Sequence, residues 1–123
     1  LALKKIFAKH DQIGTVIFDE IDTGVSGRVA QSIAEKMYQI STSTQVLCIT
    51  HLPQVAAMSD QHLLIEKNTI NNRTSTSIKD LNEKEKIHEL GRMMTGATLT
   101  ETAIEHSEQL LSLTKSFKEK VNV

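Results

Sequence analysis

Two acidic residues follow directly after a short apolar run near the start of the chain. Val16 to Phe18 is continuously apolar, and Asp19 and Glu20 come immediately after it. Such a run is typical of a strand buried on both faces of a parallel sheet, and open α/β sheets bind ligands at the carboxyl edge of their strands. A carboxylate fixed at that edge can give a hard oxygen ligand to the magnesium ion of a nucleoside triphosphate. We therefore expect Asp19 to be a metal ligand.

The second acid is available for a different task, because neighbouring residues of a strand point in opposite directions. Glu20 is a candidate to orient and deprotonate the water that attacks a terminal phosphate. Asp22 adds a third acid within four residues, and such a cluster is hard to bury without a cation or hydrogen-bond donors nearby. The alternative interpretation is that these acids only end a strand and begin a solvated loop.

A histidine follows the next apolar run. His51 comes after Gln45 to Thr50, and a single helix is expected between this run and the first one. Two strands joined in this way usually lie parallel and close together, so their carboxyl ends share one edge of the sheet. An imidazole at that edge can donate a hydrogen bond to a γ-phosphate oxygen and so report which nucleotide is bound. The alternative is a histidine that caps the following helix. We interpret the histidines at positions 10, 62, 88 and 106 as surface or structural residues.

The elements that would position these residues alternate between helix and strand. The order helix, strand, helix, strand, helix, hairpin, helix, helix predicts an α/β layered domain with an antiparallel hairpin appended. Val29, Ile33, Met37 and Ile40 form the expected apolar stripe of the second helix. The expected elements are helix 1–10, strand 15–18, loop 22–27, a helix through 29–40, strand 45–50, a short helix 53–58, a hairpin at 62–81 with its turn at 68–72, and helices 83–94 and 99–118.

Composition excludes several classes of protein. The formal net charge is −1, from 14 Lys plus Arg against 15 Asp plus Glu, so the chain as a whole lacks the basic character of proteins whose main task is to grip a phosphate backbone. A DNA-binding parent protein is still compatible with this charge. Cys48 is the single cysteine, which excludes an internal disulfide and a multi-cysteine zinc site. No run of about 18 apolar residues is present, so we expect no membrane span.

Two longer stretches resemble a known family. TVIFDEIDTGVSGRVAQSIAEKM resembles the Walker B strand and D-loop of ABC-type ATPase heads, and LCITHLPQVAAMSD resembles their switch-histidine segment. Within that superfamily the sequences DEIDTGVSGRVA and THLPQVAA are most similar to those of the RecN family of bacterial SMC-like double-strand-break repair ATPases. The stretch RTSTSIKDLNEKEKIHELGRMMTGATLTETAIEHSEQLL also looks like the family's carboxyl-terminal segment, so residues 1–123 together resemble the carboxyl-terminal half of such a head.

The resemblance implies a role for each matching residue. It implies that Asp19 helps to hold Mg²⁺, that Glu20 is the hydrolytic base and that His51 senses the γ-phosphate of ATP. It also implies that a loop crosses to the second head of a homodimer; its residues are Asp22, Thr23, Gly24 and Ser26. The resemblance further implies a cytoplasmic, nucleoid-associated protein that engages DNA in its intact form, with no membrane partner.

Two parts of a complete head are missing from the sequence. No GxxxxGK[ST] phosphate loop occurs, although the backbone N–H groups and lysine of that loop normally carry much of the triphosphate charge. The family's glycine-rich signature turn, which directly precedes the counterpart of LALKK, is also missing. We therefore expect an amino-terminal half of the head to be a partner, and this chain alone to be inactive as an ATPase.

Two other functions are compatible with the same residues. A metal-dependent nuclease or primase-type domain could use Asp19, Glu20 and Asp22, with Glu66 as the candidate acid from another strand. A non-catalytic dimerisation or docking module could instead present the amphipathic helices at 83–94 and 99–118 to a partner. Metal-dependent nicking of DNA that is lost in Glu20→Gln would separate the nuclease from an ATPase segment.

Overall fold

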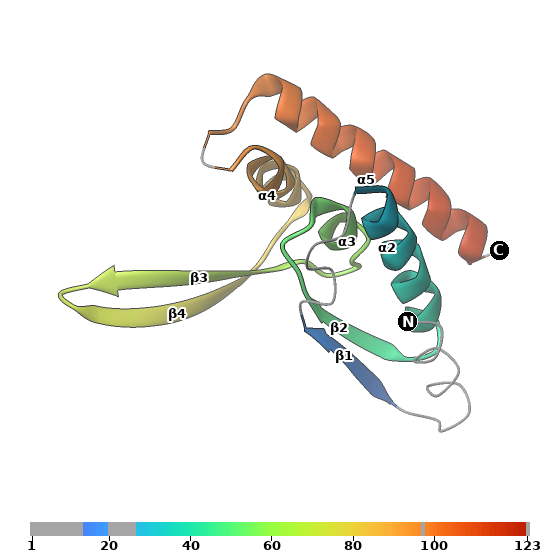
Figure 1. Ribbon diagram of the computed structural model, residues 1–123, viewed down its shortest axis with the longest axis horizontal. Coiled ribbons are helices and arrows are strands. Elements are labelled where there is room, and N and C mark those ends of the chain that lie inside the picture. The colour runs from blue at the N-terminus through green and yellow to red at the C-terminus, as the bar shows by residue number, and fades with distance from the viewer. Residues whose placement is uncertain (1–13, 20–26, 97, 123) are drawn as a thin grey trace.

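The chain folds into helices packed on one side of a small sheet, with a long hairpin extending from them (Figure 1). The computed structural model describes residues 14–19, 27–96 and 98–122. The α/β class is confirmed, and the helix expected at 1–10 lies outside the described residues. The elements are β1 (Thr15–Asp19), α2 (Gly27–Ser41), β2 (Gln45–Ile49), α3 (Pro53–Ala57), β3 (Leu63–Ile70), β4 (Arg73–Asp80), α4 (Glu83–Thr95) and α5 (Glu101–Val121).

The first two strands form a parallel pair. Thr15 lies opposite Gln45, and Asp19 lies opposite Ile49. Helix α2 connects the strands and packs against α3 and β2. The expectation that the apolar run ending at Phe18 and the run before His51 lie side by side in the same direction is therefore confirmed.

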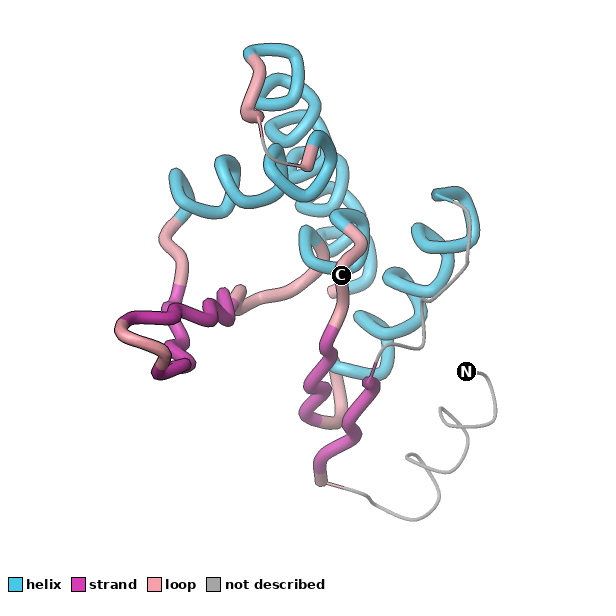
Figure 2. The backbone as a smooth tube through the Cα atoms, turned by 60° about the vertical axis from the view of Figure 1, so that its left-hand side comes forward, coloured by secondary structure: helices cyan, strands magenta, loops and turns pink. Residues whose placement is uncertain are grey.

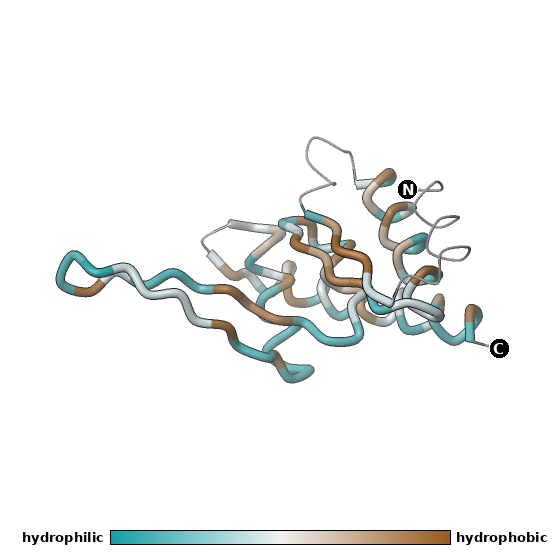
Figure 3. The backbone as a smooth tube through the Cα atoms, turned by 90° about the horizontal axis from the view of Figure 1, so that it is seen from below, coloured by the Kyte–Doolittle hydropathy of each residue, from teal (hydrophilic) through white to brown (hydrophobic). Residues whose placement is uncertain are grey.

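The expectation that these strands are buried on both faces is wrong. Val16 and Phe18 are buried in a core with α2, α3 and the end of α5. Ile17 points to the other face and is 65% exposed, and Leu47 and Ile49 on β2 are 47% and 49% exposed. The reason is that the described helices cover only one face of the sheet. In Figure 3, which shows the molecule from below, the two strands appear side by side as largely hydrophobic segments.

The buried face of α2 is rotated from the expected stripe. Met37 and Ile40 are buried as expected, but Val29 is exposed and Ile33 is only partly buried. Ala30 and Ala34 are fully buried in their place. Small side chains allow a helix to lie close to its neighbours, and contact with the sheet and α3 therefore selects the alanine face over the bulkier β-branched one.

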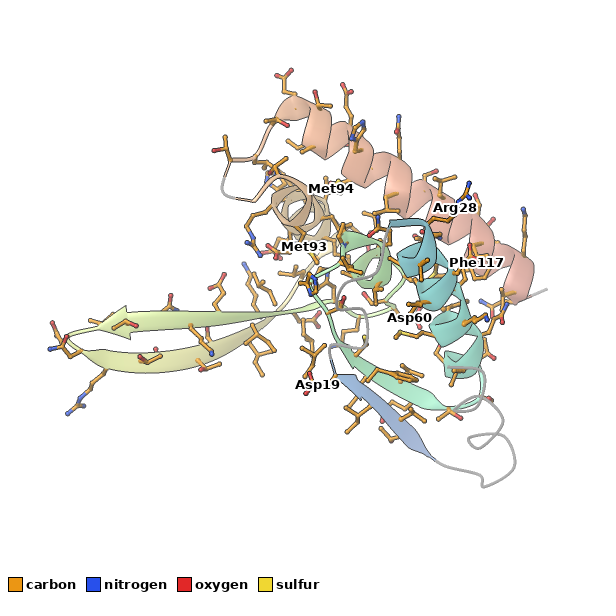
Figure 4. All side chains as sticks on the ribbon, in the orientation of Figure 1. Asp19, Arg28, Asp60, Met93, Met94 and Phe117 are labelled. Carbon is orange, nitrogen blue, oxygen red and sulfur yellow. The ribbon has the colours of Figure 1, made fainter. Side chains whose placement is uncertain are left out.

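The end of α5 closes the core on the side of α2. Phe117 meets Tyr38 edge to face, with 6.2 Å between the ring centroids. Lys118 Nζ lies 5.1 Å from the Tyr38 ring centroid and donates to the Ser59 carbonyl at 3.1 Å and to Asp60 Oδ1 at 3.0 Å. Figure 4 labels Phe117 and Asp60 in this region. These contacts hold the segment that leaves α3 against the last turns of α5.

The hairpin forms a second, separate sheet. Strands β3 and β4 pair antiparallel from Leu63 opposite Asp80 to Ile70 opposite Arg73. Asn71 and Asn72 have φ angles of 53° and 63°, the left-handed pair typical of a two-residue type I′ turn. The turn therefore consists of two residues, whereas the sequence predicted a longer turn at 68–72. The paired strands extend correspondingly farther than expected. Figures 1 and 2 show the hairpin extending away from the helices.

The last two helices pack against each other closely. Asn82 and Glu85 form a capping box at the start of α4, and Thr100 Oγ1 accepts from Ala103 N at the start of α5. Leu90 of α4 is fully buried against α3 and α5, whereas Met94, one turn later on α4, is exposed. In the described part of the chain, no helix combines the length and apolar character needed to cross a membrane.

Candidate functional site

Asp19 ends β1 at the carboxyl edge of the parallel sheet. Alternate residues of β1 are buried, and Asp19 is exposed together with Thr15 and Ile17. Because side chains alternate along a strand, the Asp19 carboxylate leaves the sheet on the same open face as Ile17. Figure 4 labels Asp19 at this end of the strand. The position gives a ligand open access to the carboxylate from outside the chain.

His51 lies at the same edge, on the neighbouring strand. Ile49 is the register partner of Asp19, and His51 follows two residues later. The chain turns directly after β2, because Leu52 N donates to Thr50 Oγ1 at 3.0 Å, and Pro53 then begins α3. His51 is exposed on this turn. The structure thus brings the carboxylate of Asp19 and the imidazole of His51 to one rim of the sheet.

The remaining predicted site residues lie outside the described residues. They are Glu20, Asp22, Thr23, Gly24 and Ser26. Helix α2 begins at Gly27, directly after this segment, although the sequence placed Gly27 in the loop. The roles of these five residues therefore stay predictions, and what the structure adds is the position of both segments that flank them.

Gln54 is a residue that the sequence interpretation missed. It lies in the first turn of α3, three residues after His51, and its side chain reaches the start of α2. A Cβ atom on Gly27 would lie 3.3 Å from Gln54 Nε2. Gln54 Oε1 is buried and has no hydrogen-bond partner among the described residues. The available signal was a polar residue in the otherwise apolar sequence PQVAAM. The Gln54 side chain places the turn that carries His51 next to the start of α2.

The metal chemistry of this edge is only partly contained in the described residues. Within 14–19, 27–96 and 98–122, no three His, Cys, Asp or Glu side chains gather in a way that could hold a metal ion. An exposed carboxylate at a strand end does fit a single ligand to Mg²⁺, which usually keeps several waters and takes one or two carboxylates. Asp19 fits that role, and the other ligands must come from elsewhere.

Glu66 does not join this edge. It lies on β3 in the second sheet and lines an open groove of about 470 Å³ between the hairpin and α4, together with Lys79, Glu85 and Glu89. Lys79 forms an ion pair with Glu85 in this groove. Asp19 is not among the residues that line it. The further acid expected for a nuclease-like site is therefore part of a different surface.

The histidine at the base of the hairpin has a structural setting. His62 is half-buried, and burial lowers the pKa of its imidazole; Glu89 opposes this shift and Lys86 adds to it. His62 Nδ1 is buried and makes no hydrogen bond to any described residue. His88 and His106 are exposed on α4 and α5. The interpretation of these three histidines as surface or structural residues agrees with their positions, and His10 lies outside the described residues.

Comparison with known proteins finds several DNA repair proteins that are similar in sequence. No family model matches the chain. The DNA repair protein RecN of Halalkalibacterium halodurans is 54% identical over 118 residues, which cover 96% of this chain and 21% of that protein. RecN of Bacillus subtilis is 53% identical over 90% of this chain and 19% of its own length, and RecN of Streptomyces coelicolor is 40% identical over 94% and 20%. The chain spans about one fifth of the length of these curated relatives.

A solved structure is similar in fold. It comes from work on the structural biochemistry of ATP-driven dimerization and DNA stimulated activation of SMC ATPases. The superposition has a TM-score of 0.59 and 18% sequence identity, and it covers 79% of this chain and 59% of that chain. The likeness shows that most of this chain shares its fold with part of that SMC ATPase chain.

Proposed function

This chain belongs to the RecN family of DNA repair proteins as one segment of its members' length, and we propose that it forms the carboxyl-terminal part of an ATP-hydrolysing head. In the intact protein the head would bind ATP with Mg²⁺ between two copies and would couple hydrolysis to the engagement of DNA during repair. Such a protein would act in the cytoplasm, associated with the nucleoid. The hydrolysis of ATP would need residues from outside this chain.

The observation that carries the proposal is the shared edge of β1 and β2. In the parallel register Asp19 lies opposite Ile49, and His51 follows Ile49 by two residues. Both Asp19 and His51 are exposed. Ligands of open α/β sheets bind at this edge, where residues from neighbouring strands converge. The argument for function therefore rests on the positions of two side chains of suitable chemistry as well as on family membership.

Each residue would have a separate task at this edge. Asp19 would be a ligand to Mg²⁺, which supplies charge neutralisation for the phosphates when it is bound. Glu20 would accept a proton from the attacking water, whose oxygen forms a bond to the γ-phosphorus while the bond to the bridging oxygen of ADP breaks. His51 would donate a hydrogen bond to a γ-phosphate oxygen. The products are ADP and inorganic phosphate.

The open face of the sheet supports the need for an amino-terminal half. Ile17, Leu47 and Ile49 form an exposed apolar surface beside Asp19, and such surfaces mark contacts with other protein. Among the described strands, β1 and β2 pair only with each other, so each of them has an outer edge that faces no other described strand. The proposed half-head would cover this face and would bring the phosphate loop that the sequence lacks. The alternative of a docking module differs from this proposal only in lacking hydrolysis.

The proposed second head would meet the segment that follows Glu20. In this proposal Asp22, Thr23, Gly24 and Ser26 would cross to the partner head. The Gln54 side chain lies close to Gly27 at the start of α2, and this proximity supports a connection between this segment and the His51 turn. Binding of ATP at the sheet edge would in this way alter the contact between the two heads.

The direct test is Glu20→Gln in a full-length protein that carries this segment. Removal of a general base slows a reaction by about 10²- to 10⁴-fold, so steady-state hydrolysis should fall by at least about a hundredfold. Binding of ATP should persist, and a dimer dependent on ATP should accumulate in size-exclusion chromatography. Glu119→Gln on α5 is the matched control, because it removes the same charge from an exposed helical position away from the edge.

Three outcomes would contradict the proposal. Hydrolysis at the unchanged rate in Glu20→Gln would show that Glu20 is not the base. Nicking of plasmid DNA that depends on metal and is lost in the same variant would favour the nuclease. Micromolar binding of Mg-ATP by the isolated 123-residue chain, measured by calorimetry, would show that the phosphate loop is dispensable and that the assignment to a half-head is wrong.

A further inference from the structure

The outer half of the hairpin differs in composition from the rest of the chain. Residues 67–76, which we term the distal ribbon, contain Lys67 and Arg73 and no acidic residue. The other eight positions are Asn, Thr and Ser apart from Ile70. The chain as a whole has a net charge of −1, so this ribbon is a local excess of positive charge with many hydrogen-bonding side chains.

The distal ribbon is an exposed and well-defined arm. Every residue of it is exposed, and it forms the part of the hairpin farthest from the helices in Figures 1 and 2. The type I′ turn fixes its tip, and Thr69 and Thr74 hydroxyls lie 3.4 Å apart across the strands. Among the described residues, neither Lys67 nor Arg73 forms an ion pair. Their charges are therefore available to a partner.

The inner half of the hairpin is built for a different contact. Ile65 and Ile78 lie opposite each other, and Lys79 pairs with Glu85 of α4. Leu64 and Leu81 line the groove against α4. The inner half is thus anchored to the helices and carries several apolar side chains, whereas the distal ribbon has no such anchor and Ile70 as its one apolar residue.

The two cations of the distal ribbon lie on opposite faces. Lys67 is the register partner of Thr76, and Arg73 is the partner of Ile70. Because consecutive positions of a strand alternate between faces, the pair containing Lys67 and the pair containing Arg73, three positions apart, project to opposite sides. Hydroxyl and amide side chains occupy both faces between them. A partner with negative charge on two facing walls would therefore match the ribbon.

We propose that the distal ribbon inserts into a groove of duplex DNA, with Lys67 and Arg73 each contacting a phosphate of a different strand. The major groove is about 12 Å wide and admits a two-stranded ribbon, and its two walls carry phosphates. Ser, Thr and Asn side chains make many of the contacts to phosphate and sugar oxygens in protein–DNA complexes. The inference rests on the proposed function for the identity of the polyanion as DNA.

Duplex DNA fits better than a single strand. Proteins that bind single strands stack the bases on aromatic side chains. No aromatic residue occurs from Leu63 to Asp80. The ribbon offers charge and hydrogen bonds but no stacking surface, so its contacts would be with the backbone of a regular duplex and would carry little sequence preference.

The test is Lys67→Gln/Arg73→Gln in a full-length protein that carries this segment. Binding to a mixed-sequence duplex is measured by fluorescence anisotropy between about 50 and 200 mM salt. We expect a roughly tenfold rise in Kd at low salt and a slope of log Kd against log salt that is smaller by about 2 for each ribbon bound. Binding of a single strand and hydrolysis of ATP without DNA should not change. Lys115→Gln/Lys120→Gln on α5 removes the same charge elsewhere and should leave the slope unchanged.

A second variant guards against local misfolding. Thr74→Glu/Thr76→Glu keeps both cations and adds carboxylates to the face that carries Lys67, so it should also weaken duplex binding while the circular dichroism spectrum stays unchanged. Duplex affinity and salt slope equal to the unchanged protein in both variants would overturn the inference, as would an equal loss in the α5 control. Absence of ATP hydrolysis in the unchanged protein would instead overturn the proposed function, because duplex binding is read separately.

Discussion

The two small sheets of this chain expose side chains for different reasons. The parallel pair β1–β2 is covered by helices on one face and exposes Ile17, Leu47 and Ile49 on the other. The distal ribbon of β3–β4 is exposed on both faces and is almost entirely polar. An exposed apolar face is typical of a surface that contacts other protein, whereas an exposed basic ribbon is typical of a surface that meets a charged partner or solvent. Exposure alone therefore says little until the chemistry of the exposed side chains is considered.

The largest expected effect comes from substitutions at two neighbouring residues of β1, one buried and one exposed. Phe18 is 4% exposed and Ile17 is 65% exposed, although both are large apolar residues in one strand. In the isolated chain, Phe18→Ala should lower the free energy of unfolding by about 3–5 kcal/mol or prevent folding, because it removes a buried aromatic ring. Ile17→Ala should change it by less than about 0.5 kcal/mol. Urea titration followed by far-ultraviolet circular dichroism measures both.

The Ile17→Ala substitution should also have different effects in the isolated chain and in a full-length protein. If an amino-terminal half covers the open face, Ile17→Ala should cost about 2–4 kcal/mol in the larger protein, because Ile17 becomes part of a core there. An equally small effect in both contexts would show that the open face stays in solvent, and the proposed half-head would lose its main structural support.

The tip of the hairpin tests whether the two sheets are independent. Asn72 has a φ of 63°, a left-handed conformation that costs about 1–2 kcal/mol for most residues and that Asn tolerates well. Asn72→Ala should therefore destabilise the hairpin by about 1 kcal/mol. Hydrogen exchange should quicken at β3 and β4 and stay unchanged at β1 and β2. Asn72→Gly is the matched control and should preserve protection, and faster exchange across both sheets would contradict the independence.

Much of the fold could be predicted because local patterns dominate it. The apolar runs before Asp19 and His51 and the proline at the start of α3 each specify an element locally. Burial could not be predicted in the same way. An apolar run such as VIF reads as a fully buried strand whether or not its second partner lies in the same chain, and so the exposure of Ile17 was missed.

Other differences arise from packing between elements. The face that α2 buries is decided by close approach to the sheet, which favours Ala30 and Ala34 over Val29. The length of β3 and β4 is decided by the type I′ turn, since the Asn-Asn pair at 71–72 can hold a tight reversal and lets pairing continue through polar residues that resemble a loop. Gln54 was missed because its contact is with Gly27, far away in the sequence.

The candidate site could be predicted as far as the strand ends. Asp19 and His51 lie at one edge because parallel strands joined by a helix place their carboxyl ends together. Glu20, Asp22, Thr23, Gly24 and Ser26 lie outside the described residues, and the tasks assigned to them stay predictions. A phosphate loop and a second head are long-range features that no local pattern in this sequence specifies.

The smallest expected effect concerns His62 at the base of the hairpin, directly before β3. Burial lowers the pKa of His62 from its ordinary value of 6.5, so the folded chain binds a proton there less readily than the unfolded chain. Below about pH 6.5 the unfolded state therefore holds more protons, and stability should fall as the pH decreases from there towards the pKa of the folded state. Above this range His62 is neutral in both states and contributes no pH dependence.

His62→Gln should remove this contribution and leave the others. One proton changes the slope of stability against pH by at most about 1.4 kcal/mol per pH unit, so the two proteins should diverge below pH 6.5 and run in parallel above it. Urea titrations at a series of pH values provide the comparison. Parallel curves throughout would show that the pKa of His62 is not lowered in the folded chain, and that the base of the hairpin is more open to water than its half-buried position indicates.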